Sequence, residues 1–164
     1  MGDYMVATQK RKKIRLKDYK YSENGVYFIT ICTKNRQNLL WDVGATCGRL
    51  NIEPPLSDLG KIIDGEIHKI DSIYENAEIN KYVIMPNHIH MIIILNEGIR
   101  RPQVAPTISR ILQQFKGSIT KQVGCSIWQK SFYDHIIRNE LDYQKIWQYI
   151  DTNPVKWKDD QYYI

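Results

Sequence analysis

Two apolar runs lie almost back to back in the middle of the chain, and their short connection restricts the possible folds more than any other feature. Residues 79–85 and residues 88–95 are rich in β-branched and large apolar side chains, which favours extended strands. Only Pro86 and Asn87 separate the two runs. Because so short a link suits a tight turn between adjacent strands, the runs are expected to pair as antiparallel neighbours in one sheet.

Two further strands are predicted, one on each side of this pair in the sequence. Residues 26–33, VYFITICT, follow a turn signal at 23–25 and are rich in β-branched and aromatic side chains. A shorter strand is expected over residues 133–138. The sequence therefore predicts an antiparallel sheet of four to five strands.

Three helices are predicted from apolar residues that recur every three to four positions. The first follows Ser57 as its cap, the second runs from near Thr107 to a stop at Gly124, and the third covers about residues 141–152. An Asn-Pro pair at 153–154 ends the third, because the residue before proline avoids helical geometry. This order of elements predicts an α+β, ferredoxin-like fold with two helices on one face of the sheet and a C-terminal helix. In such a fold the first and third strands pair at the centre of the sheet.

Length and composition indicate one globular domain. The 164 residues are 43% hydrophobic and 25% charged, which is ordinary for a chain with a folded core. The longest apolar stretch, residues 91–95, is too short to cross a bilayer, and the start of the chain lacks the apolar segment of a secretory signal. A cytoplasmic protein without a membrane partner is expected. The three cysteines lie far apart, so neither disulfides nor a thiolate zinc site is predicted.

A basic run precedes the first predicted strand. Residues 10–20, KRKKIRLKDYK, carry seven basic side chains against one acid, in a chain with a formal net charge of +5. Such a run can neutralise several phosphates of a nucleic acid, and it can equally be a solvated arm. We expect a basic N-terminal arm over residues 1–22 and a single domain over residues 23–164.

Two of the four histidines lie two positions apart, in NHIH at 87–90. Residues at this spacing on a strand point to the same face, so His88 and His90 are expected side by side, opposite Ile89 and Met91. Two such imidazoles can bind one divalent cation and leave positions open for a phosphate oxygen. An isolated pair of this kind more often fills a half-polar strand surface, so both interpretations stay open on this motif alone.

The last predicted helix carries a tyrosine that its apolar face does not require. That face is expected to consist of Tyr143, Ile146, Trp147 and Ile150. Tyr149 lies roughly 100° from the centre of this face, and Asn153 follows one turn later on the same side. A phenol and an amide carbonyl so placed could serve one site, although an edge tyrosine with its hydroxyl in water is the commoner case.

Four motifs occur in order along the chain. They are YFIT at 27–30 with TKNR at 33–36, YVIMPNHIH at 82–90, YDHIIR at 133–138 and YIDTNP at 149–154. With these motifs, and over about residues 13–157, the chain resembles the REP-associated tyrosine transposases. These are relatives of the insertion-sequence 200 group within the HUH superfamily of single-strand transposases.

The resemblance implies an HUH endonuclease fold in which His88 and His90 bind a divalent metal, Mg²⁺ or Mn²⁺, and Asn153 completes the metal site. It implies that Tyr149 attacks single-stranded DNA beside a hairpin, which gives a 5′-phosphotyrosine link and a free 3′-hydroxyl. Single-stranded DNA with repeat-type hairpins is the expected partner. A monomer is favoured over a dimer that exchanges the tyrosine helix.

Several other side chains, which are not expected to react or to bind the metal, are candidates for contacts with DNA. The cations expected to meet phosphates are Arg15, Lys34, Arg36, Lys116 and Arg138. Trp128 and Phe132 are aromatic candidates for stacking on unpaired bases. For each residue a solvated charge or a core aromatic is the alternative.

Three functions are compatible with these features. The first is a metal-dependent transesterase that cuts and rejoins single-stranded DNA through Tyr149. The second is a domesticated, non-catalytic DNA- or RNA-binding protein of the same fold. The third is a metal hydrolase that uses water as its nucleophile and forms no protein-linked product.

Overall fold

A four-stranded antiparallel sheet organises the computed structural model, which describes residues 24–42, 56–96 and 107–163. The strands are β1 (Gly25–Cys32), β2 (Ala77–Ile84), β3 (His88–Leu95) and β4 (Tyr133–Ile137). Their order across the sheet is β2-β3-β1-β4, so the first and third strands form the central pair as expected. The predicted antiparallel pairing across Pro86 and Asn87 is confirmed. The arm predicted for residues 1–22, including Arg15, lies outside the described residues.

Three α-helices and two short 3₁₀ segments complete the described chain. They are η1 (Lys34–Arg36), α1 (Asp58–Ile73), α2 (Ile108–Val123), α3 (Glu140–Thr152) and η2 (Trp157–Asp159). The predicted caps are confirmed, since the Ser57 hydroxyl accepts the amide of Gly60 at 3.0 Å and Gly124 adopts the left-handed conformation with φ 78°. Across these described segments, no helix combines the length and the apolar character that a membrane span needs.

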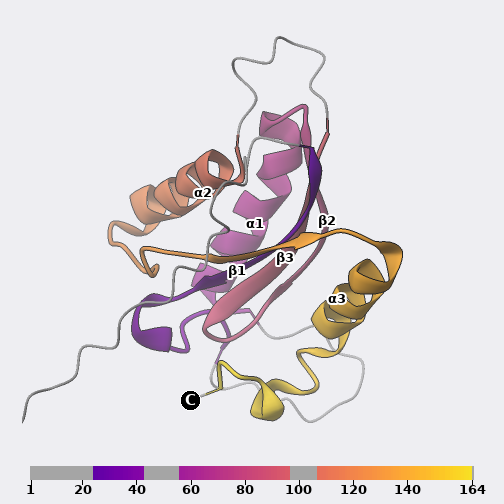
Figure 1. Cartoon of the computed structure of the whole chain (residues 1–164). Coiled ribbons are helices and arrows are strands. Elements are labelled where there is room, and N and C mark those ends of the chain that lie inside the picture. Colours follow the sequence, from indigo (N-terminus) through magenta and orange to yellow (C-terminus); the bar gives the residue numbers. More distant parts are fainter. Residues whose placement is uncertain (1–23, 43–55, 97–106, 164) are drawn as a thin grey trace, which may run out of the picture.

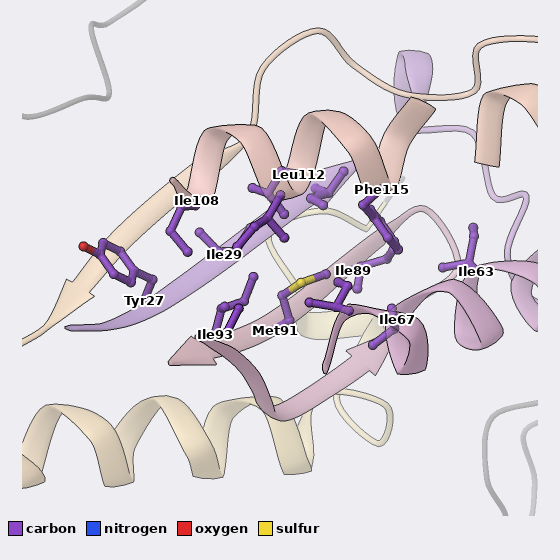
Figure 2. Close-up of a cluster of buried hydrophobic side chains, with 14 of the residues drawn as sticks. Tyr27, Ile29, Ile63, Ile67, Ile89, Met91, Ile93, Ile108, Leu112 and Phe115 are labelled. Carbon is purple, nitrogen blue, oxygen red and sulfur yellow. The ribbon is translucent and has the colours of Figure 1, made fainter. Parts of the chain in front are cut away.

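The two faces of the sheet bury different sets of side chains. Ile89, Met91 and Ile93 of β3 point towards α1 and α2 (Figure 2). They form the main core with the buried side chains of these two helices. On the opposite face, Ile92 packs in a smaller cluster with Ile150 of α3. Because side chains alternate along a strand, His88 and His90 share the face of Ile92, which is the face that α3 approaches. The α+β fold with two helices on one face is therefore confirmed, and α3 stands apart from them (Figure 1).

The predicted apolar face of α3 is wrong at one position, Trp147. Tyr143, Ile146 and Ile150 do pack into the smaller cluster, but Trp147 is 40% exposed. Its ring lies under Lys81 of β2, whose Nζ is 3.4 Å from the ring centroid and 2.6 Å from the Asp151 carboxylate. The prediction of a core position was wrong because a helix at the rim of a small cluster buries only a narrow strip. Instead, a cation–π contact and an ion pair join α3 to β2.

Gly60 on α1 is expected to tolerate no side chain, whereas Gly65 on the same helix should accept one. A Cβ at Gly60 would lie 2.3 Å from the carbonyl oxygen of Leu40, which also accepts the amide of Ser57. Gly60→Ala should therefore lower the free energy of unfolding by about 1–3 kcal/mol. Apart from its chain neighbours and the adjoining backbone of α1, no atom of the described chain lies within 4 Å of such a Cβ at Gly65, so Gly65→Ala should raise the free energy of unfolding by about 1 kcal/mol. Urea unfolding of both variants tests this, and an equal change in both would contradict the packing described.

Candidate active site

His88 and His90 meet at one point beneath α3. Both side chains are buried, with 0% and 1% of their surface exposed. Their Nε2 atoms lie 2.9 Å apart, and their ring centroids are 4.4 Å apart. Two nitrogens that each lie ~2.1 Å from one shared cation are separated by roughly 3 Å. The prediction that the two imidazoles project side by side is confirmed.

Neighbouring polar groups hydrogen-bond with the Nδ1 atoms of the two rings and so orient them. Asn87 donates its Nδ2 hydrogens to the backbone carbonyls of Arg36 and Tyr162, which directs its Oδ1 at Nδ1 of His88, 2.8 Å away. An amide oxygen only accepts, so Nδ1 of His88 carries the hydrogen and Nε2 carries a lone pair. Nδ1 of His90 also has a hydrogen-bond partner, the Thr30 hydroxyl, whose Oγ1 lies 2.8 Å away. Such outer hydrogen bonds are the usual support of metal-binding imidazoles.

Burial keeps both imidazoles neutral at physiological pH. It lowers the pKa of His88 to about 3, and the charge of Arg36 acts in the same direction. Burial and the neighbouring His88 hold the pKa of His90 well below its ordinary value, although Asp160 opposes this shift. Neutral imidazole is the form that binds a cation. The pair thus offers two nitrogen donors at one place.

Tyr149 of α3 faces the same point. Its hydroxyl lies 3.2 Å from Nε2 of His90 and 3.2 Å from a carboxylate oxygen of Asp160. The side chain is 36% exposed, so the phenol borders the smaller cluster, as predicted. Burial raises the pKa of Tyr149 above its ordinary value and the charge of Asp160 raises it further, while a hydrogen bond with Asn153 acts in the opposite direction. The phenol is therefore protonated at neutral pH unless a cation stabilises its anion.

The segment that follows α3 turns back over the imidazoles. The ring of Tyr162 lies 4.5 Å from that of His88, and the ring of Trp157 lies 5.9 Å from it. The guanidinium of Arg36 lies over the ring of Tyr162, with Cζ 5.2 Å from the ring centroid. Burial raises the pKa of Tyr162 to about 12. The burial of His88 thus depends on residues beyond the last helix.

Asp160 is the acidic residue of this segment that reaches the imidazoles, and no pattern in the sequence indicated it. The ligand atoms of His88, His90 and Asp160 all lie within 4.8 Å of one another. Asn153 donates its Nδ2 to Asp160 at 2.8 Å, and its own buried Oδ1 has no hydrogen-bond partner in the part of the chain described. An acid shortly after the Asn-Pro pair is the only signal that could have indicated Asp160, and it is a weak one.

A pocket of about 360 Å³ opens beside the phenol. It lies along α3 and the turn that follows, and its lining includes Lys145, Gln148, Tyr149 and Lys156. Two of these side chains are cationic, and the pocket also reaches Asn153 and two acids, Asp159 and Asp160. The site therefore has an open side, with two lysines and two aspartates, next to its buried imidazoles.

The predicted DNA-contacting cations occupy different surroundings. Arg36 lies beside the imidazoles, and Lys34 is exposed in the same short segment η1. Lys116 donates its Nζ to the backbone carbonyls of Gln129 and Ser131 at 3.0 and 3.2 Å, and burial lowers its pKa to about 8. Arg138 is exposed after β4, at the end where Ile137 pairs with Val26, far along the sheet from the Thr30–His90 pair.

The two aromatic candidates for base stacking also differ from a free surface group. Trp128 is only 5% exposed and lies beside Phe115 in the main core, with ring centroids 6.1 Å apart. The suggestion that Trp128 stacks on DNA was wrong, because its ring is already packed within the protein. Phe132 is partly buried against the same core, with the Lys116 ammonium 5.9 Å from its ring centroid.

Known proteins resemble this chain in sequence and in fold, although no protein-family model matches it. An uncharacterized protein of Haemophilus influenzae is 34% identical, over 98% of this chain and 97% of that protein. The REP-associated tyrosine transposase of Escherichia coli is 30% identical, over 83% of this chain and 70% of its own length. The solved structure of a REP-associated tyrosine transposase bound to a REP hairpin matches with a TM-score of 0.63 and 29% identity, over 87% of this chain and 74% of that one.

The four-stranded sheet, the histidine pair and the facing tyrosine place the chain in the HUH class of transposases. The sequence and the fold together identify the family within this class. The chain belongs to the family of REP-associated tyrosine transposases. The expected family is confirmed, and a DNA-processing role follows at the level of the family.

Proposed function

We propose that this protein cuts and rejoins single-stranded DNA beside hairpins, with Tyr149 as nucleophile and a divalent cation, Mg²⁺ or Mn²⁺, at His88 and His90. The observation that carries the proposal is the 3.2 Å distance between the Tyr149 hydroxyl and Nε2 of His90. It brings a potential nucleophile from α3 to two buried nitrogen donors on β3. The solved relative is bound to a REP hairpin, which supports hairpin DNA as the partner.

The residues present fit a divalent cation. Hydrogen bonds at Nδ1 orient both imidazoles, which are neutral and point at one place. A carboxylate lies beside them. Such a mixed nitrogen and oxygen donor set suits Mn²⁺ and related ions. When bound, the cation would polarise a phosphate oxygen as a Lewis acid and stabilise charge on the transferring group.

The proposed reaction exchanges one phosphodiester for another. The phenolic oxygen of Tyr149 forms a bond to phosphorus while the bond from phosphorus to the 3′-oxygen breaks. The products are a 5′-phosphotyrosine and a 3′-hydroxyl, and the proton lost by the phenol balances the proton gained by the 3′-oxygen. Because one phosphoester bond forms for each one broken, rejoining is the reverse reaction and requires no ATP.

A monomer that acts on DNA with its own tyrosine is the arrangement we propose. One chain supplies both imidazoles and the phenol, and the contacts of Lys81 with Trp147 and Asp151 join α3 to its own sheet. Arg36 beside the imidazoles and the lysines of the pocket, Lys145 and Lys156, are suited to the phosphates on either side of the cut. Lys34 and Arg138 remain predicted contacts for the hairpin, whereas the ammonium of Lys116 is engaged by the protein.

The proposal is tested by incubating the protein with hairpin-bearing single-stranded DNA and Mn²⁺ or Mg²⁺. A covalent protein–DNA adduct that survives denaturant is expected, and an excess of EDTA should abolish it. Retained binding without any adduct would favour the non-catalytic relative. Cleavage without a protein-linked product would favour a hydrolase that uses water.

A further inference from the structure

We infer that Asp160, in the segment after α3, is the third protein ligand of the divalent cation, in place of Asn153. The cation would then join this segment to the central strand of the sheet. The inference rests on the proposed function, because it concerns the same histidine pair. It names a residue that neither the motifs of the chain nor the helical spacing indicated.

The carboxylate of Asp160 is positioned for this role from several sides. One of its oxygens, Oδ1, accepts the backbone amide of Tyr162 at 2.7 Å. The other, Oδ2, accepts the Tyr149 hydroxyl at 3.2 Å and the Asn153 amide at 2.8 Å. Its ligand atom and those of His88 and His90 lie within 4.8 Å of one another. Asp160 thus converges with the imidazoles while its neighbours fix its direction.

The amide of Asn153 is turned in a way that does not suit a ligand. Its nitrogen donates a hydrogen bond to the Asp160 carboxylate at 2.8 Å. The carbonyl oxygen lies on the other side of the same planar amide, and reversing the amide would set two oxygens against each other. Asn153 is therefore a positioning residue, which holds the carboxylate of Asp160.

Charge and ligand type point in the same direction. Two neutral imidazoles leave the double charge of a cation uncompensated, and the guanidinium of Arg36 lies on the same side of the sheet as His88. A carboxylate offsets part of that charge, whereas an amide does not. Carboxylate oxygens are also preferred ligands of Mg²⁺ and Mn²⁺. Among the residues that the structure describes, Asp160 supplies the one negative group in this cluster.

Metal binding by Asp160 should make the segment after α3 more ordered. Residues on both sides of Asp160 contact the imidazoles, since the rings of Trp157 and Tyr162 lie 5.9 and 4.5 Å from that of His88. A cation shared by β3 and Asp160 would hold these residues in place. Amide hydrogen exchange over residues 157–163 should therefore slow when Mn²⁺ is added.

The test compares Asp160→Asn with Asp159→Asn, which makes the same charge change at the next residue. Mn²⁺ binding to each full-length protein is measured by titration calorimetry without DNA. Asp160→Asn should weaken binding by about 10- to 100-fold, since even supporting residues of metal sites have effects of this size. Asp159→Asn should bind as wild type does, because Asp159 is not part of the cluster. Asn153→Ala should weaken binding less than Asp160→Asn.

Melting temperatures in EDTA establish that each variant is folded. Slower exchange over residues 157–163 with Mn²⁺ in wild type and Asp159→Asn, and not in Asp160→Asn, would support the assignment. Wild-type affinity in Asp160→Asn, or a larger loss in Asn153→Ala, would overturn it and leave the proposed transesterase in place. If the wild type binds no Mn²⁺ and forms no adduct, the proposed function fails as well.

Discussion

Tyr149→Phe is expected to eliminate the covalent DNA adduct and to leave hairpin binding unchanged. The substitution removes only the hydroxyl that lies 3.2 Å from Nε2 of His90, and the ring contact with Phe28 at 6.2 Å can persist. Loss of a nucleophile typically lowers the rate by roughly 10³-fold or more. Adduct yield on denaturing gels and hairpin affinity by fluorescence anisotropy measure the two properties separately.

Two other tyrosines make this prediction specific. Tyr143 lies on the same helix with its hydroxyl directed at Asn80 of β2, so Tyr143→Phe should form the adduct normally. Tyr162 is the alternative candidate for the nucleophile, because its ring is 4.5 Å from that of His88. Tyr162→Phe should also form the adduct. An adduct that persists in Tyr149→Phe and disappears in Tyr162→Phe would transfer the nucleophile role to Tyr162.

The parts of this site that lie on regular elements could be predicted from the sequence. A strand fixes its side chains by alternation, so the opposite directions of His88 and Ile89 followed from their positions alone. A helix fixes its faces by its period, which placed Tyr149 at the border of the cluster around Ile150. The packing of α3 on the face of the sheet that carries His88 and His90 then brings the phenol to the imidazoles.

The remaining parts depend on segments without a period. Asp160 and Tyr162 lie beyond the Asn-Pro pair, where the chain reverses direction, and their contacts with β3 are set by tertiary structure. Trp147 shows the opposite failure, because its spacing suits a core position but Lys81 offers it a contact at the surface. Periodicity predicts which face a residue occupies, and it does not predict how far the neighbouring layer extends over that face.

His90→Ala is expected to remove Mn²⁺ binding and adduct formation together. The variant loses one of two nitrogens that converge at 2.9 Å and also the partner of the Tyr149 hydroxyl. We expect Mn²⁺ affinity to fall by about 100-fold or more, since residues that merely support a metal site cost 10- to 100-fold. Calorimetry without DNA measures the affinity, and the adduct assay measures the reaction.

The control for this prediction is His68→Ala, which removes an imidazole elsewhere. His68 lies on α1 with 68% of its side chain exposed, and its Nε2 contacts the hydroxyl of Tyr82 at 3.0 Å. A ligand that binds only the folded state raises the melting temperature, so Mn²⁺ should stabilise wild type and His68→Ala but not His90→Ala. Melting in EDTA separates this effect from the loss of the His90 ring, which packs on Phe28 with centroids 5.2 Å apart. If Mn²⁺ stabilises His90→Ala as strongly as wild type, the cation binds elsewhere, and the histidine pair only packs beneath α3.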